Sequence, residues 1–167
     1  MGFMTLNNNL GDGQRRQRGF SLVEVLIALV VMSVGMLGIA GLYVQSLQAG
    51  RTSMFRHNAV TLAGDVADRI RANPIAGVAY NHAANATGTN NNCVTGGVDC
   101  NAAEMAANDI FFWQAQADDT LPAGDVAVVF TPAAGANPPT YQITVSWTEP
   151  NQVPAPTYVI TIPVLGI

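Results

Sequence analysis

The feature that most constrains this chain is a run of twenty residues, Val25 to Val44, without a single charged side chain. As an α-helix the run would be about 30 Å long at roughly 1.5 Å per residue, which is enough to cross the hydrocarbon core of a bilayer. Charged residues make up 11% of the whole chain, against roughly 25% in a typical soluble domain. The sequence therefore predicts a membrane-spanning helix at about residues 25–44.

The residues around this run indicate how it is oriented in the membrane and whether it is removed from the protein. Arg15, Arg16 and Arg18 precede the run, whereas Arg51 and Arg56 follow it. Positive charge favours the cytoplasmic side, so the N-terminus is expected to be cytoplasmic, although a three-to-two bias needs further support. A secretory signal peptide would end in a small-residue cleavage site, and no such site follows the run. The segment is therefore predicted to remain in the protein.

Glu24 is the only charged residue between Gly19 and Gly50. Ionisable side chains at the mouth of a membrane helix are costly and are often functional. If the chain were cut after Gly19, the new α-ammonium of Phe20 would lie four residues before Glu24, on the same helix face. The two charges would then pair, within one chain or between adjacent chains. The alternative is a carboxylate at the level of the lipid headgroups that has no role.

The stretch RGFSLVEVLIALVVMSVGMLGIAGL resembles the class III leader and N-terminal helix of type IV prepilins and type II secretion pseudopilins. The resemblance implies that residues 1–19 are a leader, cleaved between Gly19 and Phe20 by the prepilin peptidase, with N-methylation of Phe20. It also implies that Glu24 is the acid used in assembly. Major pilins often have a proline kink where this chain has Gly41.

The first helix is predicted to run from about residue 20 to residue 72, well beyond the membrane. Gly35, Gly38 and Gly41 either weaken it or allow close helix packing. Past residue 44, apolar residues recur mostly at steps of three, four or seven, and Asn73-Pro74 ends the pattern. This stripe, expected to pack on a small domain, comprises Leu47, Met54, Ala59, Leu62, Val66 and Ile70.

After Pro74 the chain becomes rich in Ala, Asn and Gly, and residues 81–92 (NHAANATGTNNN) are predicted to be an irregular surface loop. Cys93 and Cys100 follow it, and in an oxidising periplasm they are expected to form a disulfide. A zinc site would need more ligands, and His57 and His82 are interpreted as exposed polar residues. We therefore predict neither a metal ion nor a cofactor.

A second helix is predicted from Ala102 to Asp118, followed by strands over 126–131, 141–148 and 158–164 that are rich in Val, Ile, Thr and aromatic residues. Proline-rich loops separate the strands, which favours an antiparallel meander. One helix face carries Ala106, Ile110, Trp113, Ala117 and Leu121, and Ile143, Val145 and Trp147 are candidates for the sheet's inner face. The predicted fold class is α+β, with a periplasmic globular domain over residues 73–167 in which the long helix packs on the sheet.

The stretch from the DIFFW helix through LPAG to the YQITVSWTEP strand resembles the PilV family of minor pilins. This resemblance implies a minor pilin that helps initiate pilus assembly with other minor pilins and the major pilin or a pilus-tip protein, and so supports adhesion and twitching motility. It places the chain in the inner membrane and then in the pilus. A minor pseudopilin of type II secretion and a tip adhesin remain alternatives. Seven acids and no Lys or Arg after Arg71 argue against direct nucleic-acid binding, and no catalytic motif predicts an enzyme.

Overall fold

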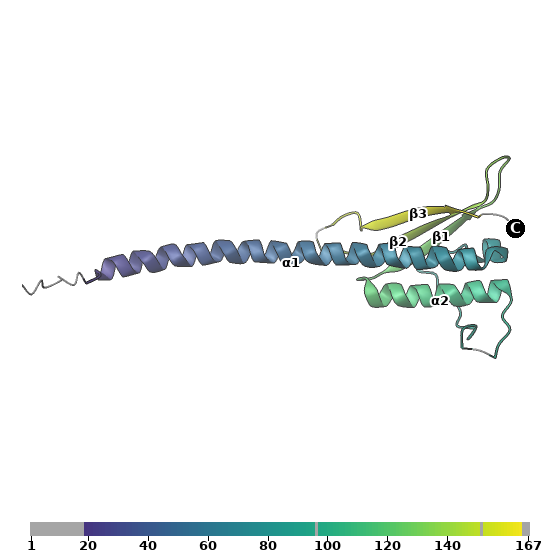
Figure 1. Cartoon of the computed structure of the whole chain (residues 1–167), viewed down its shortest axis with the longest axis horizontal. Helices are drawn as coiled ribbons and strands as arrows, with labels where there is room; N and C mark the ends of the chain where they lie inside the picture. The colour runs from purple at the N-terminus through teal and green to yellow at the C-terminus, as the bar shows by residue number, and fades with distance from the viewer. Residues whose placement is uncertain (1–18, 96, 151, 165–167) are drawn as a thin grey trace, which may run out of the picture. The chain divides into compact units, whose positions relative to one another are not determined.

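The computed structural model describes residues 19–95, 97–150 and 152–164, so the predicted leader lies outside the described residues except for Gly19. Two compact units, Met1–Gln45 and Ser46–Ile167, are described separately. The secondary structure (Figure 1) comprises helix α1 (Leu22–Ala72), the 3₁₀ segment η1 (Pro74–Tyr80), helix α2 (Ala102–Thr120) and strands β1 (Asp125–Thr131), β2 (Thr140–Ser146) and β3 (Thr157–Pro163).

The first unit contains the N-terminal part of α1. This helix begins at Leu22, two residues later than predicted, and every residue from Leu22 to Gly50 is exposed. Within the described part of the chain, α1 is the one helix that is long and apolar enough to span a membrane. The helix continues through Gly35, Gly38 and Gly41 without a break.

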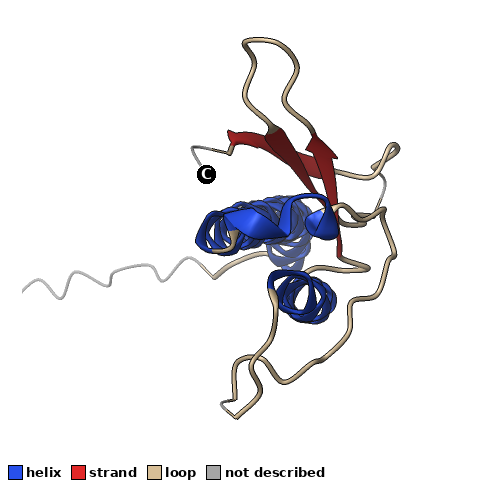
Figure 2. Cartoon of the chain, turned by 90° about the vertical axis from the view of Figure 1, so that its right-hand side faces the viewer, coloured by secondary structure: helices blue, strands red, loops and turns tan. Residues whose placement is uncertain are grey.

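The second unit confirms the predicted α+β class. Its three strands form an antiparallel sheet in the order β1-β2-β3, with Val128 opposite Ile143 and Ile143 opposite Ile160. Figure 2 shows the helices on one side of the sheet. A sheet that is covered on one face alternates buried and exposed residues, and β2 shows this alternation along its whole length.

The core lies between the sheet and the helices, as the sequence analysis predicted. Ile143, Val145 and Trp147 are buried on β2 or directly after it. The predicted inner face of α2 is also buried, as is one face of α1. These residues are Ala106, Ile110, Trp113, Ala117 and Leu121, together with Ala59, Leu62, Ala63, Val66, Ala67 and Ile70.

Part of the predicted α1 stripe is wrong, because Leu47 and Met54 are each 54% exposed. At about 100° per residue, Leu47 lies roughly 100° round the helix from Val66, so steps of seven residues drift away from the buried face. The apolar residues of α1 that pack on the core begin with the partly buried Phe55. Only the later members of the stripe therefore join the core.

The 3₁₀ segment η1, which follows α1 directly, was not predicted. Its two short turns meet at a kink at Gly77, where a φ of 50° favours glycine. Ala76 and Tyr80 are buried here, and the Tyr141 hydroxyl donates a 2.8 Å hydrogen bond to the Gly77 carbonyl. As a result, η1 carries Tyr80 from the end of α1 into the core.

Candidate functional site: the processing junction and the domain that α1 carries

The predicted cleavage bond lies in an exposed segment just ahead of α1. Gly19 and Phe20 are both exposed, and the Phe20 side chain is 83% accessible. The first hydrogen bond of the following helix runs from the Val25 N–H to the Ser21 carbonyl, at 3.2 Å. A protease that needs an extended substrate would therefore reach the bond without unwinding α1.

Glu24 lies in the first turn of α1, where the free N–H groups of a helix favour a carboxylate. Phe20 and Glu24 line the same open surface hollow, together with apolar side chains of the next two turns. The residue that would carry the new α-ammonium thus lies on the same side as the acid. The structure does not include that ammonium, and the pairing stays a prediction.

The apolar side chains that follow have no cover from the described residues. A methyl group added to Gly35, Gly38 or Gly41 would meet nothing within 4 Å. Packing against residues 19–95, 97–150 or 152–164 therefore does not explain these glycines. Close approach to another helix remains the prediction for them.

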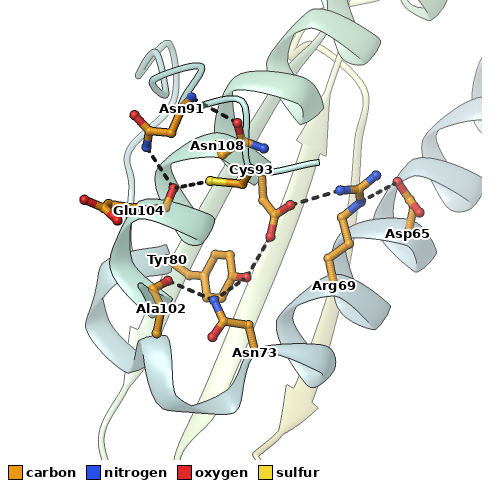
Figure 3. A network of polar contacts seen from close by, with 10 residues as sticks. Asp65, Arg69, Asn73, Tyr80, Asn91, Cys93, Ala102, Glu104 and Asn108 are labelled. Carbon is orange, nitrogen blue, oxygen red and sulfur yellow. Dashed lines mark hydrogen bonds and ion pairs between the residues drawn. The ribbon is translucent and has the colours of Figure 1, made fainter. Parts of the chain in front are cut away.

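In the second unit, a polar network joins α1, η1 and α2 around Asp109, which is 3% exposed. Its Oδ1 accepts a 2.9 Å hydrogen bond from Arg69 Nη1, and its Oδ2 accepts a 2.8 Å bond from the Tyr80 hydroxyl. Asn73 Nδ2 donates to the Tyr80 oxygen at 3.2 Å and to the Ala102 carbonyl at 2.9 Å. Figure 3 shows Arg69, Asn73 and Tyr80 converging at the end of α1.

This network is structural rather than reactive. Burial raises the pKa of the Tyr80 hydroxyl well above its usual range, and the Asp109 carboxylate that it bonds adds to this effect, while the Asn73 bond acts against it. The hydroxyl therefore stays protonated and keeps donating to Asp109. Tyr80 also stacks on Trp113 with ring centroids 5.5 Å apart, so the network connects directly to the apolar core.

A second polar cluster fastens the β2–β3 loop to α1 through Glu149. Its Oε2 accepts bonds from Thr52 Oγ1 at 2.6 Å and Gln152 Nε2 at 3.2 Å, and its Oε1 accepts from Trp147 Nε1 at 2.8 Å. The bonds from Thr52 and Trp147, and to a lesser extent the nearby Arg56 charge, lower the pKa of Glu149. The carboxylate is therefore held in its charged form.

Cys93 and Cys100 form the predicted disulfide. Asn101 follows it and caps α2, since its side chain accepts from the N–H groups of Ala103 and Glu104 while Glu104 bonds back to the Asn101 N–H. Upstream, Gly88 approaches α2 so closely that an added Cβ would lie 2.2 Å from the Phe111 nitrogen. The disulfide thus closes a loop that is already attached to α2 at both ends.

The interpretation of His82 as an exposed polar residue is wrong. It is half-buried, its Nδ1 lies 2.8 Å from the Tyr80 carbonyl and its Nε2 lies 3.1 Å from the Val126 carbonyl. The backbone of His82 also bridges to Val128 on β1. His57 is exposed on α1, and among the described residues no three His, Cys, Asp or Glu side chains gather as a metal site would require.

Two protein-family models match the chain. One describes the prokaryotic N-terminal methylation motif and matches residues 14–40, and the other describes the type IV pilin Tt1218 and matches residues 41–111. Searches of curated proteins and of solved structures found no match.

The apolar N-terminal helix, the methylation motif and the small α+β domain define a pilin or pseudopilin subunit, of a kind that is anchored in a membrane. More narrowly, the two matches support a type IV pilin with a class III leader. Membership of this family suggests a structural subunit that assembles with other pilins and is a substrate of the prepilin peptidase.

Proposed function

We propose that the chain is a minor pilin, similar to PilV, that helps initiate assembly of a type IV pilus. The observation that carries this proposal is the methylation motif over residues 14–40, followed by a helix that is exposed from Leu22 to Gly50. Such an apolar helix needs a partner outside its own chain. Lipid would supply that partner before assembly and the helices of other pilins afterwards.

The leader is the first step to test. We propose cleavage between Gly19 and Phe20 by the prepilin peptidase, followed by N-methylation of Phe20. A mass spectrum of the protein from sheared filaments should begin at Phe20 and carry one added methyl group. Gly19→Glu should leave uncleaved precursor in the membrane, whereas the nearby control Ser21→Ala should be processed. A mature protein with a different first residue would contradict the leader assignment.

Glu24 would then set the position of the subunit in the filament. In a core of packed apolar helices, a carboxylate without a positive partner is costly, so only stacking that brings it to an N-terminal ammonium is favoured. Glu24→Ala should be cleaved normally yet enter filaments poorly. The control Glu24→Asp keeps the charge and should incorporate better than Glu24→Ala. Normal incorporation of Glu24→Ala, measured in sheared pili, would disprove this role.

The globular domain is proposed to lie in the periplasm before assembly, with the N-terminus in the cytoplasm. The Cys93–Cys100 disulfide supports an oxidising compartment. We propose the other minor pilins and the major pilin or a pilus-tip protein as its partners. Deleting the gene should abolish piliation, and with it adhesion and twitching. Pili that persist while adhesion falls would favour a tip adhesin, and lost protein secretion with normal pili would favour a pseudopilin.

A further inference from the structure

The first turns of α1 beyond the membrane run carry charge of one sign only. Arg51 and Arg56 are the only charged residues between Glu24 and Asp65, and both are exposed. Since α1 is continuous, Arg51 follows Val44 by about 10 Å along the helix axis. Headgroups extend roughly 5–8 Å beyond each side of the hydrocarbon core, so a long arginine side chain at this level reaches lipid phosphates.

Exposed apolar side chains accompany these arginines. Leu47 and Met54 lie four residues before and three residues after Arg51, on one side of α1, and each is 54% exposed. In the β2–β3 loop, Val153 is 98% exposed. The Thr52 bond to Glu149 holds this loop beside the same turns of α1. Apolar side chains beside cations are typical of segments that lie in a membrane interface.

The loop adds no unpaired negative charge that would oppose contact with an anionic surface. Its acid, Glu149, accepts hydrogen bonds from Thr52, Trp147 and Gln152 and lies near Arg56. Thr52 and Glu149 act here as positioning residues, because their hydrogen bond holds the start of the loop that carries Val153 to α1.

We propose that Leu47, Arg51, Met54 and Val153 form an interfacial collar that binds anionic phospholipid headgroups while the subunit waits in the membrane. Arg51 contacts the phosphates, and the three apolar side chains enter the headgroup layer. This proposal rests on the membrane anchoring of α1 and adds a second contact, which must be released when the subunit enters a filament.

The test uses the full-length chain in vesicles that contain brominated phosphatidylcholine and phosphatidylglycerol. Val153→Trp should be quenched by the bromine atoms clearly more than Val94→Trp, a control at an exposed valine of the disulfide loop, after subtraction of the wild-type signal. Arg51→Gln should reduce the added quenching several-fold, whereas Arg71→Gln at the far end of α1 should not. Replacing phosphatidylglycerol by phosphatidylcholine, or adding salt, should also reduce it.

Flotation of the same vesicles tests the membrane anchor separately from the collar. Protein that does not float contradicts the anchor, whereas protein that floats with equal quenching at positions 153 and 94 contradicts the collar alone. Quenching that depends on the protein-to-lipid ratio would show that a second copy covers Val153, which also overturns the lipid assignment. Thr52→Val should weaken the quenching of Val153→Trp by releasing the loop, without changing flotation.

Discussion

Helix α1 contains two halves that are equally helical but differ in what their side chains contact. From Leu22 to Gly50 every residue is exposed, and between Val25 and Val44 the side chains are apolar on nearly every side of the helix. From Ala59 to Ile70 the apolar residues other than the exposed Val60 share one buried face, and Asp65, Asp68 and Arg69 occupy other positions. Apolar composition alone therefore does not decide whether a helix packs within its own chain.

The two halves of α1 differ in where the cover for their apolar side chains comes from. The second half has an amphipathic pattern, and a sheet of matching apolar residues lies on its buried side. The first half has no polar face that water would favour and no cover from the described residues. A helix that is apolar all round is stable only when it is surrounded, so its surroundings come from outside the chain.

The largest expected effect tests this comparison with one matched pair of substitutions. Val66→Asp places a carboxylate in the core and should lower the free energy of unfolding by more than about 4 kcal/mol, enough to unfold the domain. Val30→Asp should leave the unfolding of the domain in detergent unchanged, because Val30 is 61% exposed. Tryptophan fluorescence during denaturant titration measures both. A clear loss of domain stability in Val30→Asp would show that the two halves are coupled.

The next effect is confined to the domain. Replacing Cys93 and Cys100 by serine removes a closed loop of eight residues, which should lower the free energy of unfolding by up to about 2.5 kcal/mol in the chain-entropy model. Unfolding of the wild type with and without reductant should reproduce the difference, and the double variant should not respond to reductant. The helix content of α1 should not change, since the disulfide lies in the loop ahead of α2 and its Cys93 sulfur approaches the Glu104 carbonyl of α2.

A smaller loss of stability is expected from Asp109→Ala. Asp109 lies on α2 and accepts the bond from Arg69 near the end of α1. The substitution removes the acceptor for Arg69 and Tyr80, and we expect a cost of about 2 kcal/mol. This cost is limited because Arg69 is partly exposed to water and retains its ion pair with Asp65 at 3.5 Å. The control Arg71→Ala breaks an exposed ion pair with Asp68 and should cost at most a few tenths of a kcal/mol. Equal costs for the two variants would contradict the structural role of the network.

Much of this fold follows from local patterns. The uncharged run, the alternation in β2 and the inner face of α2 depend on residues that are close in sequence, and the structure agrees with all three. The extent of the α1 stripe did not follow, because the cover for Leu47 and Met54 would have had to come from distant segments. The angle between Leu47 and Val66 indicates that the stripe drifts off the buried face, but where the cover ends depends on those distant segments.

The polar network could be predicted only in part. Asp109 lies three residues after Ala106 and four before Trp113, so helical spacing places it on the buried face, where an acid needs a partner. Its partner Arg69 is 40 residues away, and no local pattern identifies it. His82 was missed for the same reason, since its ring approaches a carbonyl that lies 44 residues further along the chain. The roles of Gly19, Phe20 and Glu24 remain predictions from the resemblance.

The smallest expected effect is a pH dependence of stability at Glu149, and it locates the boundary between the two halves of α1. Because the folded state lowers the pKa of Glu149 below its ordinary value of 4.5, its ionised form stabilises the fold above that pH. This contribution is lost as the pH falls through the lower pKa of the folded state. Glu149→Gln should therefore be slightly less stable than the wild type near pH 7 and equally stable well below pH 4.5. Thr52→Val should show the same pH dependence, whereas Thr61→Val, at an exposed position of α1, should not. If Thr52→Val has no such dependence, the β2–β3 loop does not fasten to α1 at Thr52, and the covered half begins closer to Ala59.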